Sequence, residues 1–146
     1  MAAVWAEENT RDSLFDAMKR RETYATTGSR MVVRFFGGWN FTEADTHTRL
    51  PAAAGYAKGV PMGGDISAAP NGKAPTFLIR AVKDPVDANL DRVQVVKGWL
   101  DDEGMPQEKV FNVVWSDGRD VDADGNIPPV GNTVDLSNGS YTNCRY

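Results

Sequence analysis

The sequence has almost none of the residues that build disulfides and transition-metal centres. Its 146 residues include one cysteine and one histidine. A single thiol cannot form a disulfide within the chain, and it fits either redox compartment. Zinc-type sites need several ligands that converge, so we interpret His47, alone in a polar stretch, as a surface residue. A catalytic pairing of His47 with Cys144 or with a serine is disfavoured for the same reason.

The sequence also lacks a long hydrophobic run and a basic stripe. No apolar stretch approaches the roughly 20 residues that a membrane-spanning helix needs. Glu7 and Glu8 interrupt the apolar start before the hydrophobic part of a signal peptide can form. The chain carries 16 Lys and Arg against 20 Asp and Glu, a net charge of -4. We therefore expect no membrane span and no nucleic-acid partner, and the cellular compartment stays open.

A short strand and a capped helix are predicted at the start of the chain. Asn9 or Thr10 is expected to cap the first helical turn. The apolar stripe of this helix consists of Leu14, Phe15 and Met18 and requires a partner surface.

The strand-like residues Val4 and Trp5 lead directly into this helix, with no turn cluster before them. We expect the strand that pairs with them to lie outside this sequence. Residues 1–30 are accordingly predicted to be a helix and strand from the end of a missing N-terminal catalytic domain.

The remainder of the chain is predicted to be mainly β. Alternating or valine-rich segments bounded by Pro, Gly and Asp are typical of strands in antiparallel sandwiches. Residues 31–146 are therefore predicted to form an incomplete antiparallel, immunoglobulin-like β-sandwich, truncated at its C-terminal end. The expected strands are 31–36, 76–82, 90–100 and 110–115, with short closing strands at 134–136 and 140–144.

A long segment rich in Gly, Ala and Pro, residues 37–75, is predicted to be a functional or mobile loop. Its aromatic residues Trp39, Phe41 and Tyr56 are candidates for a carbohydrate-binding face. The alternative is that they pin the loop to the sandwich. The turn at residues 63–65 resembles a phosphate-binding loop only superficially, and we interpret it as a glycine corner before a short edge strand.

The acidic run Asp120, Asp122 and Asp124 is the clearest chemical signal in the sequence. Carboxylates at alternate positions followed by Gly125 match the first part of a calcium-binding loop. Gly131 stands where such a loop needs a bidentate glutamate. The run therefore predicts either weak calcium binding or an ordinary polar hairpin.

Several long motifs carry a resemblance to known families. Residues 8–12 and 19–28 resemble the closing segment of polymerase-and-histidinol-phosphatase-type (PHP) metal hydrolase domains. Other stretches are similar to the C-terminal part of a bacterial family, the domain of unknown function 3604. This second resemblance covers nearly the whole chain. Its motifs are residues 34–39, 55–65, 95–99 and 128–135.

The resemblance implies a larger parent protein whose N-terminal portion carries His and Asp metal ligands. None of those ligand motifs matches a position here, and the triplet at residues 45–47 lies at the wrong place in the chain. We therefore expect a non-catalytic module that buttresses a metal-dependent hydrolase domain. The alternative is a carbohydrate- or ligand-binding β-sandwich. The resemblance also implies an exported or periplasmic parent, and the compartment of this chain stays open. The uncovered helix face predicts a homodimer.

Overall fold

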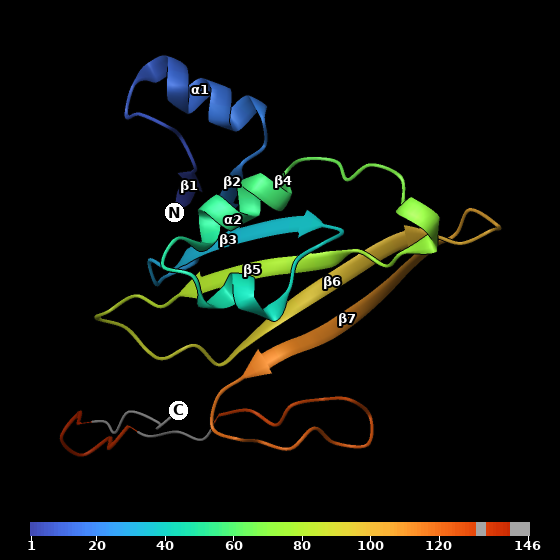
Figure 1. Ribbon diagram of the computed structural model, residues 1–146. Helices are drawn as coiled ribbons and strands as arrows, with labels where there is room; N and C mark the ends of the chain where they lie inside the picture. Colours follow the sequence, from blue (N-terminus) through green and yellow to red (C-terminus); the bar gives the residue numbers. More distant parts are fainter. Residues whose placement is uncertain (131–133, 141–146) are drawn as a thin grey trace. The chain divides into compact units, whose positions relative to one another are not determined.

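The computed structural model describes residues 1–130 and 134–140, and its backbone divides into two compact units (Figure 1). Unit 1 comprises Met1–Asp84 and unit 2 comprises Pro85–Tyr146. The chain is mainly β, with antiparallel sheets and an N-terminal helix, which is compatible with a partial sandwich. Within the described ranges, no helix has the length and apolar character needed to cross a membrane. The predicted boundary at residue 30, which assigns residues 1–30 to the end of another domain, stays a prediction.

The N-terminal strand pairs inside the chain. β1 (Ala2–Val4) forms an antiparallel pair with β2 (Thr23–Ala25). Helix α1 (Arg11–Lys19) lies between these two strands along the chain. The expectation that the strand's partner lies outside the sequence is therefore wrong, because the three residues of β2 supply it. The helix starts as predicted, since the Thr10 hydroxyl accepts a hydrogen bond from the Ser13 backbone N–H at 3.4 Å.

The predicted apolar stripe of α1 is divided between two faces. Ala17 is fully buried and Leu14 is half-buried, so these two residues face the rest of unit 1. Phe15 and Met18 are 61% and 52% exposed. The helix therefore keeps apolar side chains on its solvent side.

A three-stranded antiparallel sheet forms the centre of unit 1. β3 (Val32–Gly38) lies between β4 (Gly59–Pro61) and β5 (Thr76–Val82). In this register Phe36 is opposite Leu78, and Arg34 is opposite Arg80. These four side chains share one face of the sheet, because residues two apart on a strand point the same way. Phe36 and Leu78, both buried, are the apolar core of this face.

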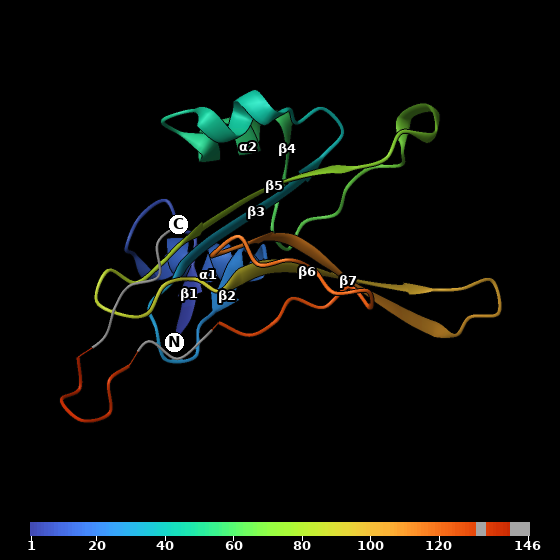
Figure 2. The ribbon, with the colours of Figure 1, turned by 90° about the horizontal axis from the view of Figure 1, so that it is seen from below.

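The predicted long loop contains helical structure. It includes the 3-10 helices η1 (Glu43–His47) and η2 (Pro70–Gly72), and helix α2 (Pro51–Lys58). Pro51 suits the first turn of α2, and its alanines favour helix. Figure 2 shows α2 over one face of β3 and β5, and α2 contacts β3. The interpretation of the whole of 37–75 as a loop is therefore wrong.

The glycine corner at residues 63–65 follows β4 rather than preceding a strand, so its predicted place was wrong. Gly63 has a φ of 84°, and a Cβ atom there would lie 2.3 Å from the Arg21 carbonyl oxygen. Only glycine permits both this conformation and this close approach. The corner thus holds the chain after β4 against the junction between α1 and β2.

Unit 2 consists mainly of a two-stranded antiparallel ribbon, β6 (Arg92–Leu100) and β7 (Pro106–Trp115), with an irregularity at Val93/Gln94. β7 begins four residues before the predicted strand at 110–115. Val134 makes an isolated bridge, and residues 136–138 form a turn, so the predicted strand 134–136 is wrong. Of the predicted strand 140–144, residues 141–144 lie outside the described residues.

Gly55 tests the packing of α2 on the sheet. A Cβ atom at this position would lie 2.6 Å from the Phe36 ring. We expect Gly55→Ala to lower the free energy of unfolding by about 1–3 kcal/mol, because overpacking outweighs the helix propensity of alanine, worth about 1 kcal/mol. Urea unfolding should show this loss in the native background and little or none in a Phe36→Leu background. An equal loss in both backgrounds would contradict the assigned contact.

Candidate functional site

A buried carboxylate occupies the junction after α1. Glu22 is only 3% exposed, and its backbone is held on both sides. Its N–H donates to the Ala17 carbonyl at 3.1 Å, and its own carbonyl accepts from the Trp5 N–H at 3.0 Å. The side chain is therefore placed by α1 and by the chain entering it. A buried charge needs partners, since its loss of hydration is costly.

The partners of Glu22 come from the C-terminal cap of α1 and from α2. The Tyr56 hydroxyl, on α2, donates to the Glu22 carboxylate. The Arg20 guanidinium lies 3.5 Å from the same carboxylate. Tyr56 in turn accepts a hydrogen bond from Arg34 on β3 at 3.1 Å. Polar contacts thus connect the junction after α1 with α2 and with β3, through Arg20, Glu22, Tyr56 and Arg34.

Trp5 completes this cluster. The Arg34 guanidinium lies 3.5 Å from the centre of the Trp5 ring, within the range of a cation–π contact. The indole N–H of Trp5 donates to the Val33 carbonyl at 3.0 Å, which fixes the ring against β3. Arg34 is therefore held between an aromatic face and a phenol. These contacts explain why a charged residue, Arg34, occupies an otherwise apolar stretch of β3.

A pocket of about 550 Å³ opens over these side chains, and we call it the Trp5–Tyr56 pocket. It combines aromatic surface with two arginines and two glutamates. Such a lining offers hydrogen-bond donors and acceptors around an apolar surface, as small-molecule sites commonly do. The residues that line it are Trp5, Ala6, Glu7, Arg20, Glu22, Arg34, Tyr56 and Pro61.

The phenol of Tyr56 is a hydrogen-bond donor rather than a base. Burial of its hydroxyl raises the pKa of Tyr56 above its ordinary value of 10.0, and the hydrogen bond to Glu22 raises it further. The hydrogen bond from Arg34 opposes this shift and does not overcome it. Tyr56 therefore stays protonated at neutral pH, and its proton satisfies the buried carboxylate.

The three aromatic residues predicted to bind carbohydrate have different surroundings. Tyr56 lines the Trp5–Tyr56 pocket. Phe41 covers the backbone of Gly38 and Gly59, where a Cβ atom would lie 3.0 Å and 2.6 Å from its ring. Trp39 is half-buried, and its indole N–H has no hydrogen-bond partner among the described residues. Phe41 thus pins its segment to β3 and β4, and carbohydrate binding by this set stays a prediction.

The acidic run of unit 2 forms a tight turn. The Asp122 carboxylate accepts hydrogen bonds from the backbone N–H groups of Asp124, at 3.0 Å, and Asn126, at 2.7 Å. Across residues 1–130 and 134–140, no three His, Cys, Asp or Glu side chains are grouped so as to hold a metal ion. Asp122 therefore stabilises its own turn, while calcium binding by Asp120, Asp122 and Asp124 stays a prediction. His47 ends η1 and is exposed.

Sequence reasoning missed most of the polar cluster. Trp5 was expected to belong to a strand whose partner lies outside this sequence, whereas it packs on Arg34 and Tyr24. Glu22 follows two arginines, and sequence reasoning included it only in the motif at residues 19–28. The one available signal was Arg34, a charge inside the apolar run 32–36. Such a residue on a half-buried strand needs a specific partner.

Fold and pocket together define a mainly β protein with a polar, aromatic-lined pocket next to its N-terminal helix. The chain belongs to the family described as protein of unknown function (DUF3604), whose model matches residues 1–145. This confirms the family inferred from its motifs. No curated protein and no solved structure matches the chain.

Removing the Tyr56 hydroxyl tests the polar cluster. We expect Tyr56→Phe to lower the free energy of unfolding by about 1–3 kcal/mol at pH 7, because it leaves the buried Glu22 short of a donor. Urea unfolding measures this loss. Tyr24→Phe is a matched control, since no hydrogen bond joins the Tyr24 hydroxyl to the part of the chain that the structure describes.

The stability that the Tyr56 hydroxyl gives to the native chain depends on pH in a defined direction. A raised pKa in the folded state means that the folded protein holds the Tyr56 proton more tightly than the unfolded chain does. This contribution is complete below pH 10.0, the ordinary phenol value, and is lost as the pH rises through the folded-state pKa. We expect the stability difference between the native chain and Tyr56→Phe to narrow at alkaline pH. A difference that stays constant up to the alkaline limit would contradict the assigned hydrogen bond.

Proposed function

We propose that this chain is a non-catalytic accessory module of a larger DUF3604 protein and that it buttresses a metal-dependent hydrolase domain. The observation that carries the proposal is the apolar surface left exposed by β6 and β7. On one face of this ribbon Val96 lies directly opposite Val110, and they are 58% and 48% exposed. Phe111, on the other face, is also exposed.

A ribbon of this kind needs a further partner. Two-stranded sheets are marginally stable in water unless a third strand or another element packs on them. The apolar core found within the described residues is small, and it consists of Ala17, Phe36, Leu78 and Ile127. Exposed apolar patches are common at interaction surfaces. The rest of the parent protein is the occupant that we propose for β6 and β7.

Two further features support this function. Phe15 and Met18 on α1 are exposed as well, so the N-terminal segment also offers apolar side chains. Residues 8–12 and 19–28 resemble the segment that closes PHP-type hydrolase domains, which supports a place next to such a domain. Because the ligand motifs of those hydrolases match no position in this sequence, catalysis is assigned to the parent and not to this chain.

Binding to the rest of a DUF3604 protein tests the proposal. The remaining part of a full-length family member is expressed separately and titrated with this chain. We expect Val96→Lys and Phe111→Lys each to weaken binding at least about tenfold, because each places a charge in the apolar contact. Val86→Lys is the matched control, since Val86 lies outside β6 and β7 and is 91% exposed. Absence of binding by the native chain would contradict the proposal.

A second copy of this chain is the competing occupant. Light scattering coupled to size exclusion distinguishes the two occupants. A monomer of 15.9 kDa is expected if the apolar surface is reserved for the parent. A stable dimer that Val96→Lys dissociates would instead assign the surface to self-association, as the predicted homodimer requires.

The Trp5–Tyr56 pocket favours a second candidate function, the binding of a polyhydroxylated ligand such as a sugar. Its volume of about 550 Å³ lies within the range of small-molecule sites, roughly 300–1,000 Å³. Aromatic faces bind the apolar side of a sugar ring, and the charged groups bind its hydroxyls. Arg20, at the pocket's exposed side, is a suitable probe because half of its side chain is exposed.

A glycan array tests this second candidate. We expect a glycan bound by the native chain to be lost or bound at least about tenfold more weakly by Arg20→Gln. Arg11→Gln, on α1 and outside the pocket, should leave binding unchanged. A glycan bound equally by both variants is bound elsewhere, and an array without any bound glycan removes the candidate.

A further inference from the structure

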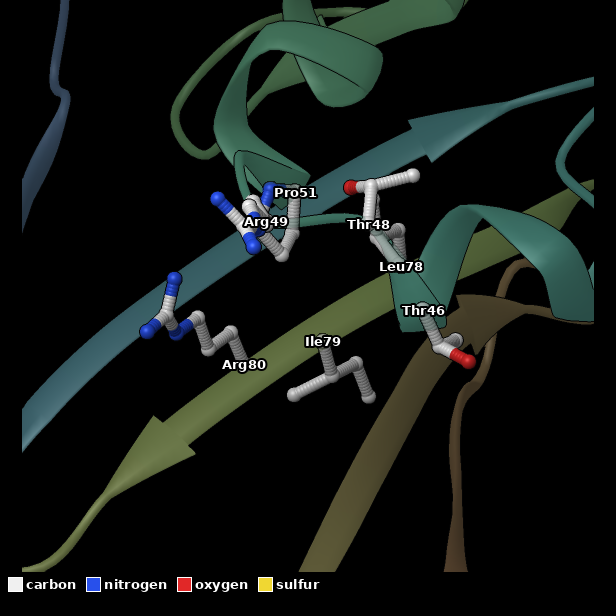
Figure 3. Close-up of a pocket in the computed structure, with 7 residues that line it drawn as sticks. All are labelled: Thr46, Thr48, Arg49, Pro51, Leu78, Ile79 and Arg80. Atoms are coloured by element: carbon white, nitrogen blue, oxygen red, sulfur yellow. The ribbon is translucent and has the colours of Figure 1, made fainter.

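A second pocket of unit 1 lies between β5 and the chain that leads into α2, and its volume is about 250 Å³ (Figure 3). Arg80 and Ile79 belong to β5, whereas Pro51 is the first residue of α2 and Arg49 lies in the segment just before it. Two arginines therefore reach one small pocket from different elements. The complete lining is Thr46, Thr48, Arg49, Pro51, Leu78, Ile79 and Arg80.

Within residues 1–130 and 134–140, no ion pair compensates the positive charge of this pocket. No hydrogen bond or ion pair joins the side chain of Arg49 or of Arg80 to any other described residue. Arg80 also lies directly opposite Arg34 in the sheet. Like charges at directly opposite positions destabilise a sheet. The Arg34 guanidinium has partners in the Trp5 ring and the Tyr56 hydroxyl, whereas the Arg80 side chain has no such partner among the described residues.

The polar groups next to the two arginines are engaged in hydrogen bonds of their own, so Arg49 and Arg80 are the donors available to a ligand. The Thr46 hydroxyl donates to the Glu43 carbonyl at 2.7 Å, and the Thr48 hydroxyl donates to the Asp45 carbonyl at 3.4 Å. The Asp45 carboxylate is bound by Lys58 at 2.6 Å and by the Thr42 N–H at 2.8 Å. Asp45 is therefore already satisfied by other groups.

We propose that this pocket binds an oxyanion, a phosphate or sulfate group carried by a small ligand. A guanidinium group presents a fork of N–H donors that matches two oxygens of such a group. Two forks from different elements can hold one tetrahedral anion. The start of α2 adds the positive end of a helix dipole next to Arg49. The proposal is independent of both functions proposed above.

Titration with inorganic anions tests the site. The full chain is titrated with sodium sulfate, sodium phosphate and sodium acetate, each against sodium chloride at the same ionic strength, because screening alone changes surface electrostatics. Thermal unfolding and calorimetry measure binding. We expect saturable binding and a raised melting temperature with sulfate or phosphate, and a weaker effect with acetate.

Substitutions assign the effect to the pocket. Arg49→Gln and Arg80→Gln should each weaken anion binding about tenfold, because each removes one charge-assisted contact. Arg80→Lys keeps the charge without the fork and should weaken binding less. Arg11→Gln, an exposed arginine on α1, is the control and should bind like the native chain. Equal binding by all four variants, or an effect explained by ionic strength alone, would overturn the proposal.

Discussion

The burial of the Glu22 carboxylate is the constraint on which the arrangement of unit 1 depends. A carboxylate that is 3% exposed must be compensated, and its partners come from separate parts of the chain. Tyr56 reaches it from α2 and Arg20 reaches it from the end of α1. The N-terminal segment is thereby joined to α2, and through Arg34 to the sheet. Apolar packing alone is limited here, because few apolar side chains are buried.

The position of α2 follows from this constraint and produces both pockets. The helix lies close to the sheet because Gly55 has no side chain at the Phe36 ring. The Lys58 ammonium holds Asp45 of η1, and this hydrogen bond is the main reason that the pKa of Asp45 lies below its ordinary value. One end of α2 thus borders the arginine pocket, while Tyr56 lines the Trp5–Tyr56 pocket. Arg34 and Arg80, opposite each other in the sheet, belong to these two pockets.

The sequence predicted the elements that have local signals. Thr10 caps α1, and β5 spans the predicted residues 76–82, because capping and alternation are short-range patterns. Helix α2 was missed because its alanines show no amphipathic period, although Pro51 marked its start. The partner of β1 was missed because β2 has only three residues. The polar cluster was missed for another reason. Contacts between Glu22 and Tyr56, far apart in sequence, depend on tertiary structure.

A double-mutant cycle on Glu22 and Tyr56 tests the central claim most directly. The free energies of urea unfolding are measured at pH 7 for the native chain, Glu22→Gln, Tyr56→Phe and the double variant. Contacting residues in one hydrogen-bonded network show a coupling energy of about 0.5–3 kcal/mol. We predict that the double variant loses less stability than the sum of the two single losses, by at least about 1 kcal/mol. Losses that add within about 0.5 kcal/mol would show that the two side chains act independently and would contradict the account.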